Sequence, residues 1–184
     1  YKAKKLPFEY AIDKDMLILV AEANAKYGEY KSLLETLEFD SSYFLESVLL
    51  KESYKSTQIE GTQITQEELY YLKYMEKSDD SKEIENLKNA IEYAKKELKN
   101  GKKIDYQLVN EMHKLILDSV RGSHKSPAQI RTTQNWIGPR GCTIENATFV
   151  PPRPEEIYSL LENLYQYMND RFEDPYLINI ALSH

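Results

Sequence analysis

The sequence predicts a mainly α-helical domain that carries one β-hairpin. In most segments apolar residues recur at steps of three and four, which is the spacing of one face of a helix. Capping residues precede several of these segments, and glycine or proline marks many of their ends. Between residues 121 and 154 the helical spacing gives way to Gly, Pro, Asn and Thr around two short β-prone pieces.

Helices are predicted along nearly the whole chain outside that stretch. The predicted segments are about residues 13–37, 41–61, 65–75, 81–101, 105–120, 154–168 and 175–184. Asp13 is the expected N-cap of the first helix, and Thr65 with Glu68 is expected to form a capping box at the third. Asp174 is the expected N-cap of the last helix, because Pro175 suits the first helical position.

The exception is a predicted hairpin with a long loop. Residues 135–137 and 148–150 are the β-prone pieces, and the Gly/Pro-rich link 138–141 lies between them. From the residues alone, the simplest interpretation is an ordinary surface hairpin with Trp136 packed on the helices.

Composition and charge argue against several classes of protein. The formal net charge of −6 and the pI of about 5.2 disfavour non-specific nucleic-acid binding and a polybasic membrane anchor. No run of about 18 apolar residues is long enough for a transmembrane helix. The basic first residues lead into no apolar run, so we expect no signal peptide. Cys142 is the only cysteine, which excludes an internal disulfide and fits a reducing cytoplasm, and three scattered histidines offer no metal-ligand spacing.

The segment from Ser56 to Gly61 places a hydroxyl next to a carboxylate. Ser56 and Glu60 are four residues apart, so they lie on one face of the second predicted helix, one turn from each other. The hydroxyl can donate a hydrogen bond that fixes the direction of the carboxylate, and Gly61 can end the helix in a left-handed conformation. Because the helix dipole is negative at this end, Glu60 is expected to need a cationic partner from elsewhere. The alternative is a solvated glutamate before a capping glycine.

This segment and two later ones together resemble the N-terminal half of Fic-family protein adenylyltransferases. The later segments are residues 130–138, Ile-Arg-Thr-Thr-Gln-Asn-Trp-Ile-Gly, and residues 147–152, Ala-Thr-Phe-Val-Pro-Pro. The resemblance covers about residues 41–184, and the first forty residues look like the helical extension of Fic proteins that carry their own inhibitory helix. The implied fold is a Fic-like helical bundle with one β-hairpin, the flap.

The resemblance implies a role for each segment. Glu60 would be the inhibitory glutamate, Ser56 its orienting hydroxyl and Gly61 the last residue of the motif. The carboxylate would pair with an arginine that otherwise holds the γ-phosphate of ATP. The flap would pin an extended target peptide beside the active site. Its residues are Gln134, Asn135, Trp136, Ile137, Gly138, Thr148, Phe149 and Val150.

The family transfers AMP from ATP to a protein hydroxyl with Mg²⁺. Its catalytic loop has the form His-Pro-Phe-x-Asp/Glu-Gly-Asn-Gly-Arg-x-x-Arg, and the sequence reaches His184 without it. We therefore expect no catalytic and no metal-binding residue in this chain, no activity from it, and no binding of ATP or Mg²⁺ by it alone. The expected partners are a protein target of adenylylation and, as a homodimer, a second copy of the chain.

The predicted division is an N-terminal helical region with the inhibitory helix over residues 1–64 and an incomplete Fic domain over residues 65–184. One alternative is a regulatory or peptide-binding module without enzymatic activity, which supplies its inhibitory helix to another subunit. The other is a generic helical domain with coincidental motifs.

Overall fold

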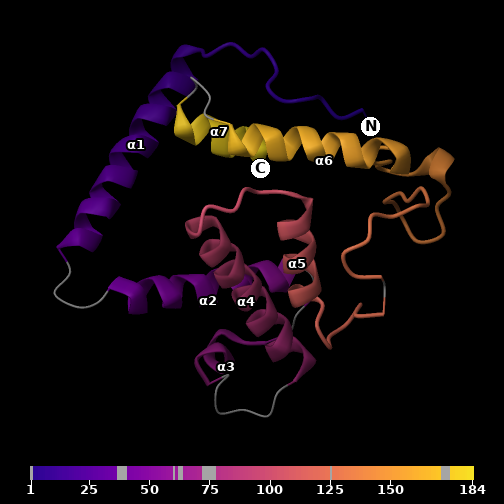
Figure 1. The fold of residues 1–184 in the computed structure, drawn as a ribbon, viewed down its shortest axis with the longest axis horizontal. Coiled ribbons are helices and arrows are strands. Elements are labelled where there is room, and N and C mark those ends of the chain that lie inside the picture. The colour runs from indigo at the N-terminus through magenta and orange to yellow at the C-terminus, as the bar shows by residue number, and fades with distance from the viewer. Residues whose placement is uncertain are drawn as a thin grey trace. The chain divides into compact units, whose positions relative to one another are not determined.

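The computed structural model describes residues 2–36, 41–59, 61, 64–71, 78–124, 126–170 and 175–184, and these residues are mainly helical (Figure 1). The helices are α1 (Lys14–Glu35), α2 (Ser41–Ile59), α3 (Gln66–Tyr71), α4 (Asp79–Lys99), α5 (Tyr106–Ile116), α6 (Pro154–Asn169) and α7 (Tyr176–Ser183). A short 3-10 helix, η1 (Ile144–Asn146), lies between α5 and α6 in the chain. The predicted mainly α-helical class is confirmed. No helix within the described ranges is long and apolar enough to cross a membrane.

The chain forms two compact units, and neither is continuous in sequence. The α2–α4 unit contains Gly28–Lys103 and Gln107–Ala128. The α6–α7 unit contains Tyr1–Tyr27, Ile104–Tyr106 and Gln129–His184. The predicted division between residues 64 and 65 stays a prediction.

The core of the α2–α4 unit lies where α2 packs against α4. Tyr54 of α2 and Ile84 of α4 are buried at its centre, and Leu50 packs against them. Burying a side chain such as that of Ile84 typically stabilises a fold by about 1.5–3 kcal/mol. At the surface, Lys88 Nζ of α4 donates to Glu46 Oε1 of α2 at 2.6 Å, and this carboxylate raises the pKa of Lys88.

Two helix starts follow the prediction closely. Asp13 Oδ1 accepts a hydrogen bond of 2.8 Å from the N–H of Met16, which caps the first turn of α1. Thr65 and Glu68 form the predicted capping box before α3. The Thr65 N–H donates to Glu68 Oε2 at 2.7 Å, and the Glu68 N–H donates to Thr65 Oγ1 at 3.2 Å.

Two other starts differ from the prediction. Ser78 is the N-cap of α4, because its hydroxyl accepts from the N–H of Ser81 at 3.1 Å, so the helix begins two residues before the expected start. Pro175 occupies the N-cap position of α7 rather than its first helical position. Asp174, the expected cap, lies outside the described residues.

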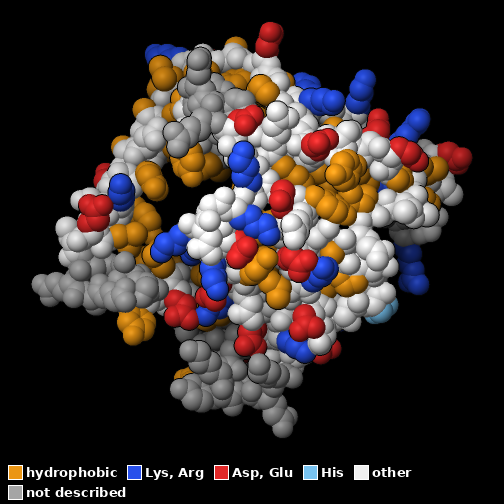
Figure 2. All heavy atoms as spheres, in the orientation of Figure 1, with side chains coloured by type: hydrophobic (Ala, Val, Ile, Leu, Met, Phe, Trp, Pro, Cys, Tyr) orange, Lys and Arg blue, Asp and Glu red, His pale blue; other side chains and the backbone are white. Residues whose placement is uncertain are grey.

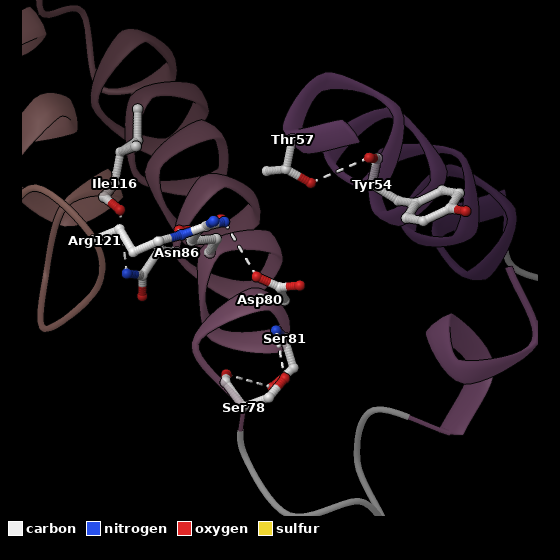
Figure 3. A network of polar contacts seen from close by, with 9 residues as sticks. Tyr54, Thr57, Ser78, Asp80, Ser81, Asn86, Ile116 and Arg121 are labelled. Carbon is white, nitrogen blue, oxygen red and sulfur yellow. Dashed lines mark hydrogen bonds and ion pairs between the residues drawn. The ribbon is translucent and has the colours of Figure 1, made fainter. Parts of the chain in front are cut away.

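A buried asparagine explains why α5 ends at Ile116 and not near Val120 as predicted. Asn86 Nδ2 of α4 donates to the carbonyls of Ile116 at 3.2 Å and Asp118 at 2.9 Å (Figure 3). The carbonyl of Ile116 belongs to the last residue of the helix and that of Asp118 follows it, and at this end the carbonyls have no hydrogen-bond donor inside the helix. Ser119 then has a φ of 55°, so the chain leaves the helical conformation.

Two asparagines of α6 hold other segments of the α6–α7 unit in place. Asn163 accepts from the N–H of Leu6 and donates to its carbonyl, both at 2.8 Å. Asn169 bonds Ile104 in the same paired way, at 2.9 and 2.6 Å. Each amide uses its donor and its acceptor on one backbone residue, which fixes the register of the segment against α6.

Candidate functional site

The predicted inhibitory motif lies at the C-terminal end of α2. Ser56 belongs to the last turns of this helix and its side chain is exposed. Glu60 lies outside the described residues, so its direction and role stay predictions. Gly61 has a φ of 98°, and its N–H donates to the carbonyl of Gln58 at 3.1 Å. A β-carbon there would meet nothing within 4 Å, so the left-handed backbone and not crowding favours glycine.

Tyr54 anchors the end of α2, although the sequence did not single it out. Its hydroxyl accepts from Gln58 Nε2 at 2.7 Å, and its carbonyl accepts from Thr57 Oγ1 at 3.1 Å. Lys55 Nζ lies 5.1 Å from the centroid of the Tyr54 ring. Tyr54 and Thr57 are buried, and Figure 3 shows both on α2 beside α4. Ser56, which follows this buried side, is left in solvent.

A cluster of charges joins the segment after α5 to the start of α4. Arg121 donates from Nε and Nη2 to the two carboxylate oxygens of Glu83, each at 2.8 Å, and from Nη2 to Asp80 at 3.1 Å. The Glu83 carboxylate raises the pKa of Arg121. This bidentate geometry is the strong form of an Arg–carboxylate pair, so Arg121 is engaged within its own unit.

The predicted β-hairpin is not a pair of regular strands. Within the described residues, Ile137 and Phe149 form one isolated antiparallel bridge, with N–H to carbonyl distances of 2.9 and 3.0 Å. The neighbouring hydrogen-bonded pairs would be residues 135 with 151 and 139 with 147, two positions away on each side. Residues 151 and 139 are prolines, which have no N–H to donate. Prolines therefore stop the ladder on both sides of the bridge.

Most of the predicted flap side chains lie at the surface of the α6–α7 unit. The exposed ones are Asn135, Trp136, Ile137, Gly138, Thr148 and Phe149, and the half-buried ones are Gln134 and Val150. Trp136 is 41% exposed, and its Nε1 donates to the carbonyl of Cys142 at 3.1 Å. The indole is thus bonded to its own loop.

Gly138 is required by close packing across this loop. A β-carbon at Gly138 would lie 2.6 Å from Cys142 Sγ and 3.3 Å from the Thr148 backbone nitrogen. The Cys142 N–H donates to the carbonyl of Pro139 at 3.0 Å, which turns the chain back after the glycine. The absence of a side chain lets the two arms of the loop approach each other.

Arginine and glutamine side chains close the base of the hairpin. Arg131 donates to the carbonyls of Thr133, at 2.9 Å, and Pro152. Gln134 Nε2 donates to the carbonyl of Pro151 at 3.1 Å. Sequence reasoning placed Gln134 in the site but not Arg131. Pro151 and Pro152 were a signal in the sequence that side-chain donors are needed here. A proline has no N–H to pair in a strand ladder, but its carbonyl still needs a hydrogen-bond donor.

The structure brings the two flap segments together but does not test how they relate to the inhibitory motif. Ser56 and Gly61 belong to the α2–α4 unit, whereas residues 134–150 belong to the α6–α7 unit. The prediction that Glu60 and the flap border one active site therefore stays a prediction.

The described residues contain no cluster of three or more metal-ligand side chains. Among them, no group of three or more His, Cys, Asp or Glu side chains lies close enough together to hold a metal ion. Mg²⁺ prefers carboxylate oxygens together with water and phosphate. We therefore assign no step of a reaction to a metal bound by these residues.

A comparison with family models assigns part of the chain. Residues 17–96 match the family described as Fic/DOC family N-terminal, and this range contains α2 and the Ser56–Gly61 segment. A comparison with curated proteins found no match. This part of the chain is therefore similar to the N-terminal region of Fic/DOC family proteins.

Proposed function

We propose that this chain is the N-terminal portion of a self-inhibited adenylyltransferase, which transfers AMP from ATP to a hydroxyl of a target protein. The observation that carries the proposal is the Fic/DOC N-terminal match, which includes the whole of α2 and therefore Ser56. Residues 130–138 and 147–152 follow in the order that the resemblance requires.

Inhibition would act through the end of α2. Ser56 is exposed, and position 60 follows it by four residues, about one helical turn. In the proposed enzyme the Glu60 carboxylate pairs with the arginine that otherwise holds the γ-phosphate, and it repels that phosphate. ATP then binds only with its phosphates turned away from in-line attack. Removing one partner of a buried ion pair typically costs about 3–5 kcal/mol, enough for a firm switch.

Target binding would act through one side of the bridge between Ile137 and Phe149. In an antiparallel pair the backbone groups alternate, so those of Trp136 and Gly138 point away from the partner segment. An extended peptide that pairs with them forms backbone hydrogen bonds, and these bonds require little of the peptide's amino-acid sequence. The exposed side chains of Trp136 and Ile137 supply apolar contact beside it.

The proposal is tested with two forms of labelled ATP and a form of the protein that includes the catalytic loop. The Glu60→Gly variant is incubated with ATP labelled at the α-phosphate and, separately, at the γ-phosphate. We expect covalent label on protein from the α-phosphate only. Label from the γ-phosphate would instead indicate a kinase. No label from either, in a folded variant, would favour the alternative of an interaction module.

A further inference from the structure

A histidine side chain of α5 accepts a hydrogen bond from the backbone of the loop that follows this helix. The N–H of Ala128 donates to His113 Nδ1 at 2.8 Å. Both residues belong to the α2–α4 unit, and Ala128 is the last residue before the chain continues into the α6–α7 unit. Within the described part of the chain, this is the only hydrogen bond made by residues 126–128. Among hydrogen bonds, it alone holds this stretch against α5.

The backbone of this stretch has a conformation that is uncommon for residues with a side chain. The φ angle is 52° at Ser126 and 61° at Ala128, and both values fall in the left-handed region. Residues other than glycine adopt this region at a cost in free energy, because the β-carbon comes close to the following carbonyl oxygen. The bond from Ala128 to His113 offsets part of this cost, since it forms only when Ala128 is in this place.

The bond requires a neutral imidazole whose proton is on Nε2. A ring nitrogen that accepts a hydrogen bond carries no proton, so the tautomer follows from the bond that His113 makes. In the imidazolium form both ring nitrogens are donors, and Nδ1–H would then point at the Ala128 N–H. His113 is exposed, so its ring exchanges protons with the solvent. Histidine side chains ordinarily change charge between about pH 5 and 8, and a proton taken up in that range removes the acceptor.

Most charged groups around this bond are engaged with other residues. Those of α5, of the loop and of the part of α4 that bonds the loop are Glu111, Lys114, Asp118, Arg121, His124, Asp80 and Glu83. Lys114 pairs with Glu111 at 2.7 Å, and Arg121 binds the two carboxylates of α4. Figure 2 shows acidic and basic side chains interspersed over α4 and α5 rather than gathered by sign. Across the described ranges no ion pair joins His113 to a carboxylate, so none stabilises the imidazolium in place of the lost bond.

We infer that His113 is a pH-sensitive latch on residues 126–128. In its neutral form it holds Ala128 against α5 through the Ala128 N–H. In its protonated form it releases the stretch, and Ser126 and Ala128 then leave the left-handed region, because no bond offsets its cost. The latch lies within the α2–α4 unit and does not depend on the proposed activity. Residues 129–150, which include the predicted flap, follow directly after the released stretch in the chain.

Hydrogen exchange of the Ala128 amide, followed by NMR on this chain, tests the latch. The protection factor, which corrects for the intrinsic effect of pH on exchange, is compared between about pH 8 and about pH 5. We expect it to fall about threefold or more at the lower pH, the effect of losing one hydrogen bond. The fall should follow the titration of the His113 ring, read from its nitrogen chemical shifts. A protection factor that stays constant while His113 titrates would overturn the proposal.

Three variants separate the latch from a general effect of pH. His113→Asn puts Oδ1 as many bonds from the backbone as Nδ1, so it keeps an acceptor that does not titrate, and protection should be high at both pH values. His113→Phe keeps a ring without an acceptor, and protection should be low at both. His124→Asn changes the other histidine near the loop, which is exposed, and should leave the pH dependence as it is. Circular dichroism verifies that each variant keeps its helix content. A pH dependence that survives in His113→Asn or disappears in His124→Asn would contradict the latch.

Discussion

The side-chain amide of Gln134 donates a hydrogen bond of 3.1 Å to the backbone carbonyl of Pro151, seventeen residues further along the chain. Arg131 makes the corresponding bond to the carbonyl of Pro152. The backbone bridge between Ile137 and Phe149 cannot extend to these residues, because Pro151 has no N–H. Side chains therefore hold the base of the hairpin where a strand ladder would otherwise do so.

Replacing Gln134 by leucine should loosen this base. The change keeps most of the side-chain volume but leaves the Pro151 carbonyl without its donor, a loss of about 0.5–1.5 kcal/mol. Trp136 is the only tryptophan, so its fluorescence reports this region in a urea titration. Gln129→Leu, the same change at an exposed position, is the control. Equal midpoints for Gln134→Leu and the unmodified chain would show that the bond contributes nothing.

Removing the Asn86 side chain should destabilise the α2–α4 unit. Asn86→Ala leaves the carbonyls of Ile116 and Asp118 without this donor near the end of α5, and it empties a buried position. We expect a loss of about 1–3 kcal/mol in the free energy of unfolding, measured by circular dichroism in urea. Asn89→Ala, at an exposed position further along α4, should change it by less than about 0.5 kcal/mol. A similar loss for both variants would argue against the capping role of Asn86.

The free energy of unfolding should decrease as the pH falls through the acid range, and Glu68 should contribute to this decrease. Hydrogen bonds from the Thr65 backbone and hydroxyl hold the pKa of Glu68 below its ordinary value of 4.5. Because the folded pKa is the lower one, this contribution is present above pH 4.5 and is lost as the pH falls through the folded pKa. Titration of the Glu68 side chain by NMR should show the lowered pKa, and Thr65→Ala, which removes the hydroxyl but keeps the backbone N–H, should return it part of the way toward 4.5. An unchanged titration in Thr65→Ala would contradict the assignment.

Alanine should have opposite effects at two glycines. Gly28 lies inside α1, and a β-carbon added there would meet nothing within 4 Å, so Gly28→Ala should stabilise the helix by about 0.5–1 kcal/mol. Gly138→Ala should destabilise its loop by about 1–3 kcal/mol, because the new methyl group overlaps Cys142 Sγ. Thermal unfolding measures both changes. The double variant Gly138→Ala, Cys142→Ala should recover part of the loss, and no recovery would place the clash elsewhere.

The helices could be predicted from the sequence because their signals are local. The Asp13 cap and the Thr65–Glu68 box depend on residues three apart, and both are present. The early end of α5 was not predictable in this way. It depends on Asn86, which lies thirty residues from Ile116 in sequence and meets it only in the fold.

The candidate site could be predicted only in part for the same reason. Spacing located Ser56 on α2 and the left-handed Gly61 after it, but the buried anchor is Tyr54, whose role depends on packing against α4. Proline positions could have predicted the short bridge of the hairpin, since residues 139 and 151 fall on its two neighbouring hydrogen-bonded pairs. The prolines indicated only that their carbonyls need donors; that Arg131 supplies one of them could not be predicted, because it depends on where the loop returns.

In the proposed enzyme, the carboxylate at position 60 holds the active site in an inactive state. The most direct measurement is the rate of AMP transfer from α-labelled ATP by the protein with its catalytic loop, compared between the unmodified form, Glu60→Gly and Ser56→Ala. We predict a rise of at least tenfold for Glu60→Gly, and a smaller rise for Ser56→Ala, in which the carboxylate remains but loses its orienting hydroxyl. An unchanged rate in a folded Glu60→Gly variant would contradict the account.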